Sequence, residues 1–143
     1  MTSVTTATLR LAPDVLSTRE IGPWLRTAMR HVDAETADAL LSRMELAVHE
    51  VCMNVVDHAH LPADSVIELS LVLSSTDLTV WVRDRGAEFD LAAIPDPAEG
   101  VLQERGYGIK IARALVSELS YRRTRSGNEL ALRIDRGGRD GGL

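Results

Sequence analysis

Residues 34–59 carry the pattern that most constrains how this chain can fold. Apolar side chains recur there at intervals of three and four residues, which is the repeat of a helix with one buried face. These positions are Ala37, Leu40, Leu41, Met44, Val48, Val51 and Val55. The pattern predicts one long helix, and a chain of 143 residues built around it is long enough to bury a core as a single domain.

Shorter patterns predict five strands and two further helices. The strands alternate apolar and polar residues or are rich in β-branched ones, and we expect them over residues 4–11, 65–74, 78–84, 119–126 and 129–134. Polar turns at "STD" (75–77) and at Ser126–Asn128 join four of them into two hairpins. The helices are expected over about residues 18–31 and from the glycines of "GYGIKIARALVSEL" onward.

The order of these elements predicts the architecture. Hairpins give mostly antiparallel pairing, so we expect an α/β two-layer sandwich in which about three helices cover one face of a mostly antiparallel mixed sheet. Residues 85–105 hold two prolines and show no clear period, which is typical of a functional lid. We expect residues 1–136 to form the domain and residues 137–143 to be a disordered tail.

Composition and charge exclude several classes of function. The net charge of −5 argues against direct nucleic-acid binding, which needs a basic surface. No apolar run reaches the roughly 18–20 residues of a membrane span, and the start "MTSVTTATLRLAP" lacks the features of a secretory signal. The lone Cys52 excludes an intramolecular disulfide and is expected to be a small core residue. These features favour a cytoplasmic protein.

Two polar residues in the long helix are candidates for chemistry. Glu50 and Asn54 are four residues apart, so they project from one face. That face lies roughly 100–140° from the centre of the apolar stripe, which by itself indicates a solvated rim. A second interpretation is a polar cleft, because other apolar residues of the helix also lie off the stripe. A carboxylate beside an amide oxygen suits an acid–base step next to Mg²⁺.

The histidines of this helix suggest a different class, a metal-dependent hydrolase that uses His49, His58 and Glu50. However, the chain has no HExxH spacing and no cysteine pair, and His58 and His60 point in different directions at the helix end. We therefore favour a helix-end role for His58, in capping or local hydrogen bonding.

A glycine motif follows the second predicted hairpin strand. In "VRDRGAEF", Asp84 ends the strand and Gly86 allows close approach of another group. The Asp84 carboxylate would accept a hydrogen bond from an exocyclic amine such as that of adenine. The alternative is an ordinary Asp-x-Gly turn.

Another glycine motif, "ERGYGIK", opens the third predicted helix. Gly106 and Gly108 leave backbone N–H groups free to face an anion, and Arg105 and Lys110 add positive charge. The sequence is not a P-loop, and the alternative is a helix that simply begins with glycine.

The order of these motifs carries a family resemblance. A helix with E-x-x-x-N, a strand end with D-x-G-x-x-F (Asp84–Phe89), a lid and a G-x-G helix start resemble the Bergerat-type ATP-binding fold of DNA gyrase, sensor histidine kinases and heat-shock chaperones. The run "EVCMNVVDHA" (Glu50–Ala59) and the ending "YRRTRSGNELALRI" are most similar to bacterial anti-sigma-factor serine/threonine kinases. The resemblance covers about residues 4–135.

The resemblance implies an Mg²⁺-dependent protein kinase that binds ATP or ADP. Glu50 matches the general base, Arg105 the lid arginine that supports γ-phosphate transfer, and Asn54 the Mg²⁺ ligand. The nucleotide-binding residues that it implies are Asn54, Asp57, Asp84, Gly86, Phe89, Gly106, Tyr107, Gly108, Ile109, Lys110 and Asn128. It also implies a STAS-domain anti-sigma antagonist as substrate, a sigma factor as sequestered partner, and a homodimer. The alternative is a nucleotide-binding regulatory module without kinase activity.

Two positions depart from the family pattern. Relatives usually have Gly-Thr where this chain has Gly127–Asn128, and Glu88 stands where a second glycine is common after Asp84.

Overall fold

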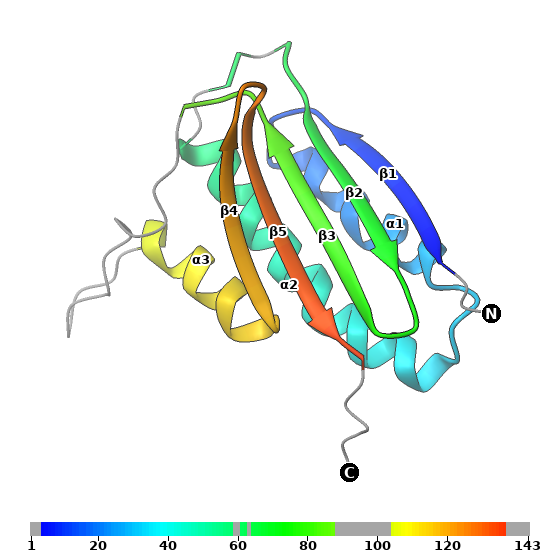
Figure 1. Ribbon diagram of the computed structural model, residues 1–143. Coiled ribbons are helices and arrows are strands. Elements are labelled where there is room, and N and C mark those ends of the chain that lie inside the picture. Colours follow the sequence, from blue (N-terminus) through cyan, green and yellow to red (C-terminus); the bar gives the residue numbers. More distant parts are fainter. Residues whose placement is uncertain (1–3, 59–60, 63, 88–103, 137–143) are drawn as a thin grey trace.

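A computed structural model describes residues 4–58, 61–62, 64–87 and 104–136 (Figure 1). The strands are β1 (Thr5–Leu11), β2 (Ile67–Leu73), β3 (Asp77–Asp84), β4 (Glu118–Thr124) and β5 (Gly127–Asp135). The helices are α1 (Ile21–Ala28), which a 3-10 helix η1 (Leu16–Glu20) precedes, α2 (Ala34–His58) and α3 (Glu104–Leu115). The predicted lid and tail lie mostly outside these residues.

The strands form one sheet in the order β1-β2-β3-β5-β4, and each neighbouring pair is antiparallel. The expectation of a mixed sheet is therefore wrong for the described strands. The connection through α3 does join two strands of the same direction, β3 and β4. However, β5 lies between them and runs antiparallel to both, so no parallel ladder forms there.

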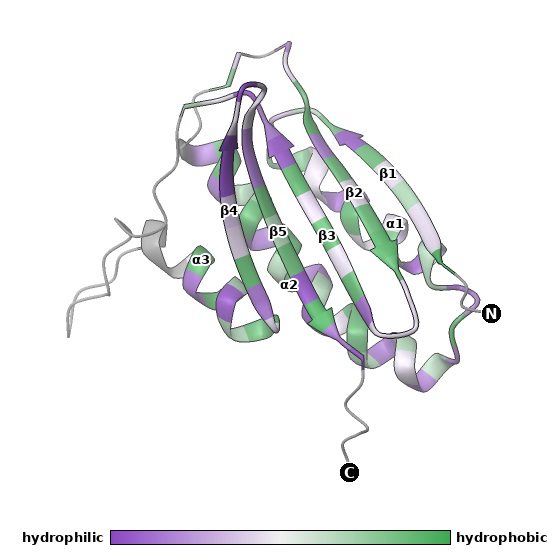
Figure 2. Cartoon of the chain, viewed as in Figure 1, coloured by the Kyte–Doolittle hydropathy of each residue, from purple (hydrophilic) through white to green (hydrophobic). Residues whose placement is uncertain are grey.

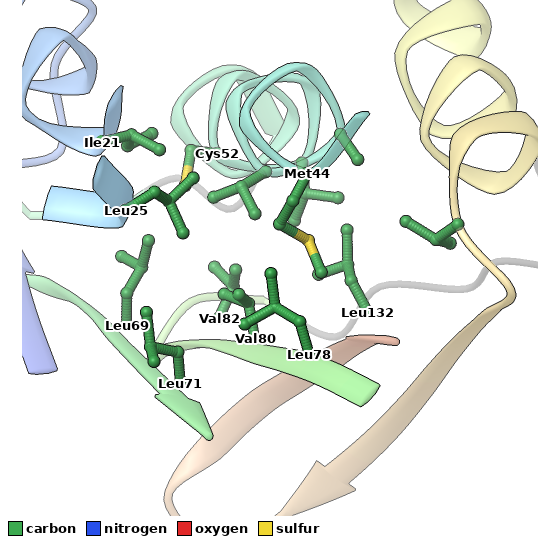
Figure 3. Packing of buried hydrophobic residues seen from close by; sticks show 14 of the residues in the cluster. Ile21, Leu25, Met44, Cys52, Leu69, Leu71, Leu78, Val80, Val82 and Leu132 are labelled. Carbon is green, nitrogen blue, oxygen red and sulfur yellow. The ribbon is translucent and has the colours of Figure 1, made fainter. Parts of the chain in front are cut away.

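The three α-helices cover one face of the sheet, as the sequence predicts, and leave the other face open (Figure 1). The predicted apolar stripe of α2 is buried, with Met44, Val48 and Val51 0% exposed. Figure 3 shows Met44 pointing toward the sheet residues Leu78 and Leu132. Each such large side chain contributes about 1.5–3 kcal/mol by burial. Cys52 is also 0% exposed, which confirms its predicted place in the core.

The first predicted helix, residues 18–31, is shorter than expected and irregular at its start. Residues Leu16–Glu20 form η1 instead, where the Ser17 N–H donates to Oδ1 of Asp14 at 2.8 Å. The helix then ends at Ala28, and α2 begins after Asp33, whose Oδ2 accepts the Thr36 N–H at 3.0 Å. Asp33 thus acts as the N-cap of α2, and this bond lowers the pKa of its carboxyl group.

The β4–β5 turn also differs from the prediction of Ser126–Asn128. Thr124 pairs with Gly127, so the turn consists of Arg125 and Ser126, and Asn128 lies inside β5. Gly127 has a φ of +132°, and a Cβ there would overlap the carbonyl oxygen of Asp84. The close approach of β5 to β3 therefore requires glycine at this position.

Charged residues cross the open face of the sheet from edge to edge. Direct cross-strand neighbours alternate in sign; they are Arg10, Glu68, Arg83, Glu129 and Arg122. Glu129 pairs with Arg83 at 2.7 Å and with Arg122 at 2.8 Å. Figure 2 shows polar and apolar residues alternating along the strands, which gives the sheet one apolar and one polar face. No helix among the described residues is long and apolar enough to cross a bilayer.

Candidate active site

Glu50 and Asn54 lie one turn apart on α2, as their spacing predicts. Asn54 is only 7% exposed, so the interpretation of a solvated rim is wrong for this residue. Its side-chain amide has no hydrogen-bond partner among the residues that the structure describes. The amide is therefore free to bind a ligand or water at this nearly enclosed position.

The half-buried Glu50 faces α3 at Gly108. A Cβ on Gly108 would lie 3.1 Å from Oε1 of Glu50 and 3.6 Å from its carbonyl oxygen. A side chain at Gly108 would therefore compete with the carboxylate for space. The glycine lets the two helices approach while the Glu50 carboxylate keeps its position, and in the described part of the chain no hydrogen bond occupies that carboxylate.

The predicted helix start is displaced by two residues. Because α3 begins at Glu104, Gly106 and Gly108 lie within its first turns rather than ahead of it. The N–H groups in the first turn of a helix have no partner within it, and Gly106, the third residue of α3, supplies one of them. The Gly106 N–H is thus available to an anion, whereas Gly108 serves the contact with Glu50.

Asp84 ends β3 with its carboxylate directed toward the helical layer, and only 5% of the residue is exposed. Its Oδ1 accepts the Gly86 N–H at 2.7 Å, an Asp-x-Gly turn, and the Asn128 Nδ2 at 3.0 Å. Burial raises the pKa of Cys52 to about 12, and the charge of Asp84 adds to this rise. Because Asp84 lies on the buried face of β3, which the helices cover, the tertiary fold brings its motif to the layer that carries Glu50 and Asn54.

The remaining predicted residues differ in what they can contribute. Ile109 is 0% exposed in the core, so only its backbone is available to a ligand. Lys110 is half-buried, and Asp57 is exposed in the last turn of α2. Phe89 lies outside the described residues, and the side chains of Arg105 and Tyr107 are not described.

The histidines do not form a metal centre in the described structure. His49 lines a shallow cavity of about 260 Å³ beside Thr18 and Leu46, near η1 and α1. No three His, Cys, Asp or Glu side chains gather to hold a metal ion in the part of the chain that the structure describes. The side chains of His58 and His60 lie outside that part.

Sequence reasoning missed two site residues, both on β4. The Tyr121 hydroxyl donates to Oδ1 of Asn128 at 2.6 Å, and Arg123 donates to the same oxygen at 3.1 Å. The available signal was the alternation of β4, which places Leu119, Tyr121 and Arg123 on one face. Arg123 shares the β4 face of the apolar Leu119, and a charged residue in such a place indicates a polar partner.

A sequence model of the histidine kinase-like ATPase domain matches residues 11–134. A comparison with curated protein sequences found no match.

Solved structures with similar folds include one of the RsbU and RsbW domains of Rv1364c from Mycobacterium tuberculosis. It superposes with a TM-score of 0.65 at 19% identity, over 90% of this chain and 32% of that chain. The histidine kinase domain of a blue-light-activated histidine kinase from Erythrobacter litoralis gives a TM-score of 0.54 at 24% identity, over 82% of this chain and 61% of that one. The chain thus spans less than two thirds of either protein, and at these identities the likeness shows the fold.

Proposed function

This chain belongs to the histidine kinase-like ATPase domain family, and from that premise we propose that it is an ATP-dependent serine/threonine protein kinase that also sequesters a sigma factor. The observation that carries the proposal is the arrangement on α2. The buried Asn54 amide has no partner among the described residues, and Glu50 lies one turn away with its carboxylate against Gly108.

Asp84 is the proposed adenine contact. An ionised carboxylate only accepts hydrogen bonds, so it favours a base with an exocyclic amine over one with a carbonyl at that position. Gly86 has no side chain to obstruct a base next to the carboxylate. The N–H groups at the start of α3 would then hold phosphate oxygens, as helix N-termini do.

Asn54 fits the role of an Mg²⁺ ligand, because its amide oxygen is a hard donor in a nearly enclosed position. Mg²⁺ bound there would neutralise charge on the phosphates during transfer. The chain itself positions the reactants and moves the proton.

Glu50 is the proposed general base. Its carboxylate takes the proton of a serine or threonine hydroxyl as the hydroxyl oxygen bonds to the γ-phosphorus. The bond between that phosphorus and the bridging oxygen breaks at the same time, and ADP leaves. Arg105 is proposed to stabilise the charge on the transferred group.

The proposed partners follow from the family resemblance. They are a STAS-domain anti-sigma antagonist as phosphate acceptor, a sigma factor that the protein sequesters, and a second copy of this chain. The fold likeness to a structure that contains an RsbW domain agrees with this choice. We further propose a cytoplasmic location, since these partners act there.

Transfer from γ-labelled ATP to purified STAS-domain proteins of the same organism tests the proposal. Wild-type protein should label the acceptor, and Glu50→Gln should slow transfer by about 10²–10⁴-fold. Asp38→Asn is the matched control, because it removes an exposed carboxylate from the same helix. Its transfer rate should equal that of the wild type.

Measured ATP affinities separate the possible failures. Unchanged transfer by Glu50→Gln with normal ATP affinity would overturn the role of Glu50 as base. Tight ATP binding by the wild type without transfer to any acceptor would favour the nucleotide-binding regulatory module.

A further inference from the structure

Asn128 uses its whole hydrogen-bonding capacity on protein partners. The residue is 3% exposed, and its Nδ2 donates to Oδ1 of Asp84 at 3.0 Å and to the carbonyl of Ala87 at 2.7 Å. Its Oδ1 accepts from the Tyr121 hydroxyl at 2.6 Å and from Arg123 at 3.1 Å. A side-chain amide offers two donors and two acceptor sites, so none is left for a ligand.

These partners allow only one orientation of the amide. If it turned over, its oxygen would face the oxygens of Asp84 and Ala87, and its nitrogen would face the Arg123 guanidinium, which can only donate. Three of the four contacts would become unfavourable, because only the Tyr121 hydroxyl among these partners can both donate and accept a hydrogen bond. Tyr121 and Arg123 therefore hold the Asn128 N–H group against Asp84.

The consequence for Asp84 is that its two oxygens become unequal. Oδ1 accepts two N–H groups, from Gly86 and from Asn128. Oδ2 accepts no hydrogen bond from the residues described here. The two bonds thus restrict rotation of the carboxylate and, within the described part of the chain, leave Oδ2 as its acceptor without a partner.

We propose that Tyr121 and Arg123 are positioning residues for base selection: through Asn128 they hold Asp84 so that Oδ2 receives the C6 amine of adenine. Asn128 itself, whose amide has no bonding group left, does not touch the base. This inference rests on the proposed nucleotide binding but not on kinase activity.

Arg123 also ties this network to the segment that follows β3. Its guanidinium donates to the carbonyl of Gly86 at 2.8 Å as well as to Asn128. Together with the bond from Asn128 to Ala87, this fixes the backbone at Gly86 and Ala87. Asp84 accepts one N–H from Gly86 and one from Asn128. Arg123 contacts both of these residues, so it holds the two donors to the Asp84 carboxylate together.

Competition between ATP and inosine triphosphate tests the inference. Inosine has a carbonyl in place of the C6 amine, so it cannot donate to Oδ2, and its affinity should not depend on how Asp84 is held. Wild-type protein should bind ATP at least about tenfold more tightly than inosine triphosphate, and the ratio of these two affinities is the measured quantity. Tyr121→Phe, which removes only the hydroxyl, and Arg123→Gln should each reduce this ratio by about threefold to tenfold.

Arg122→Gln is the matched control, because Arg122 follows Tyr121 on β4 but pairs with Glu129 on the open face. It should leave the ratio unchanged. Variants that lose affinity for both nucleotides equally would overturn the inference, since that result indicates a merely structural role. Should Arg123→Gln fail to fold, the ratio for Tyr121→Phe decides alone.

Two further outcomes separate this inference from the proposed function. A wild-type protein that binds ATP and inosine triphosphate equally would overturn base selection through Asp84 but leave the kinase proposal intact. A wild-type protein that binds neither nucleotide would overturn both. A lowered ratio in Tyr121→Phe without any phosphotransfer activity would support the inference alone.

Discussion

Gly108 of α3 faces Glu50 of α2 so closely that a Cβ on the glycine would lie 3.1 Å from Oε1 of the carboxylate. Such a contact is tighter than ordinary van der Waals distance, so the carboxylate would shift by a few tenths of an ångström. The position of the proposed base, Glu50, therefore depends on the close contact between α2 and α3 at Gly108.

Gly108→Ala should separate stability from catalysis. Alanine favours a helix over glycine by up to about 1 kcal/mol, so thermal unfolding should occur at the same or a higher temperature. Phosphotransfer should fall by about tenfold, because the base leaves its position. Ala114→Gly is the reciprocal control: it lies exposed on α3 and should lower stability without slowing transfer. Unchanged transfer in Gly108→Ala would contradict the assigned contact.

Gly127→Ala should damage both stability and nucleotide binding. The residue has a φ of +132°, and a methyl group there would overlap the backbone of Asp84. We expect a loss of about 1–3 kcal/mol in the free energy of unfolding, measured with urea, and weaker ATP binding. The neighbouring Ser126→Ala, at an exposed turn position, should change neither. A fully stable Gly127→Ala protein would refute the steric requirement.

Glu129 should make stability depend on pH below neutrality. Partial burial would raise its pKa, but hydrogen bonds and charge from Arg83 and Arg122 outweigh it and hold the pKa below its ordinary 4.5. A depressed folded pKa stabilises the fold above the unfolded value and loses that contribution as pH falls through the folded one. Glu129→Gln should therefore cost about 1 kcal/mol at pH 7.

That difference between wild type and Glu129→Gln, measured by urea unfolding, should shrink as the pH falls from about 5 to about 3. The control is Glu118→Gln, which removes a more exposed edge pair with Arg133. It should show a smaller difference at every pH. A Glu129→Gln difference that persisted at pH 3 would mean that packing, not charge, is responsible.

Cys52 should resist thiol reagents in the native protein. Burial at 0% exposure and the nearby charge of Asp84 raise its pKa from 9.0 to about 12. At pH 8 roughly one molecule in ten thousand would carry the thiolate. Absorbance after addition of Ellman's reagent should show no reaction until urea unfolds the chain, and then one thiol per chain. Rapid reaction of the native protein would contradict the packing of α2 against the sheet.

Much of the fold follows from local spacing. The apolar repeat of α2 and the alternation of the strands depend only on which face is buried, and the folded chain buries those faces. The ends of the elements were less predictable, because features such as the 3-10 geometry of η1 depend on local side-chain hydrogen bonds, here from the Ser17 N–H to Asp14. Nor does local sequence indicate that β5 lies between β3 and β4.

The order of motifs along the chain determined the family and named Glu50, Asn54 and Asp84 as candidates, because residue type and spacing are local properties. Only the tertiary structure decided how these candidate residues are buried and what they contact. The contact of Glu50 with Gly108 and the bond from Asn128 to Asp84 join residues far apart in sequence. The burial of Asn54 likewise depends on the packing around its helix. Such contacts depend on strand order and helix packing, and these follow from the burial of the whole core.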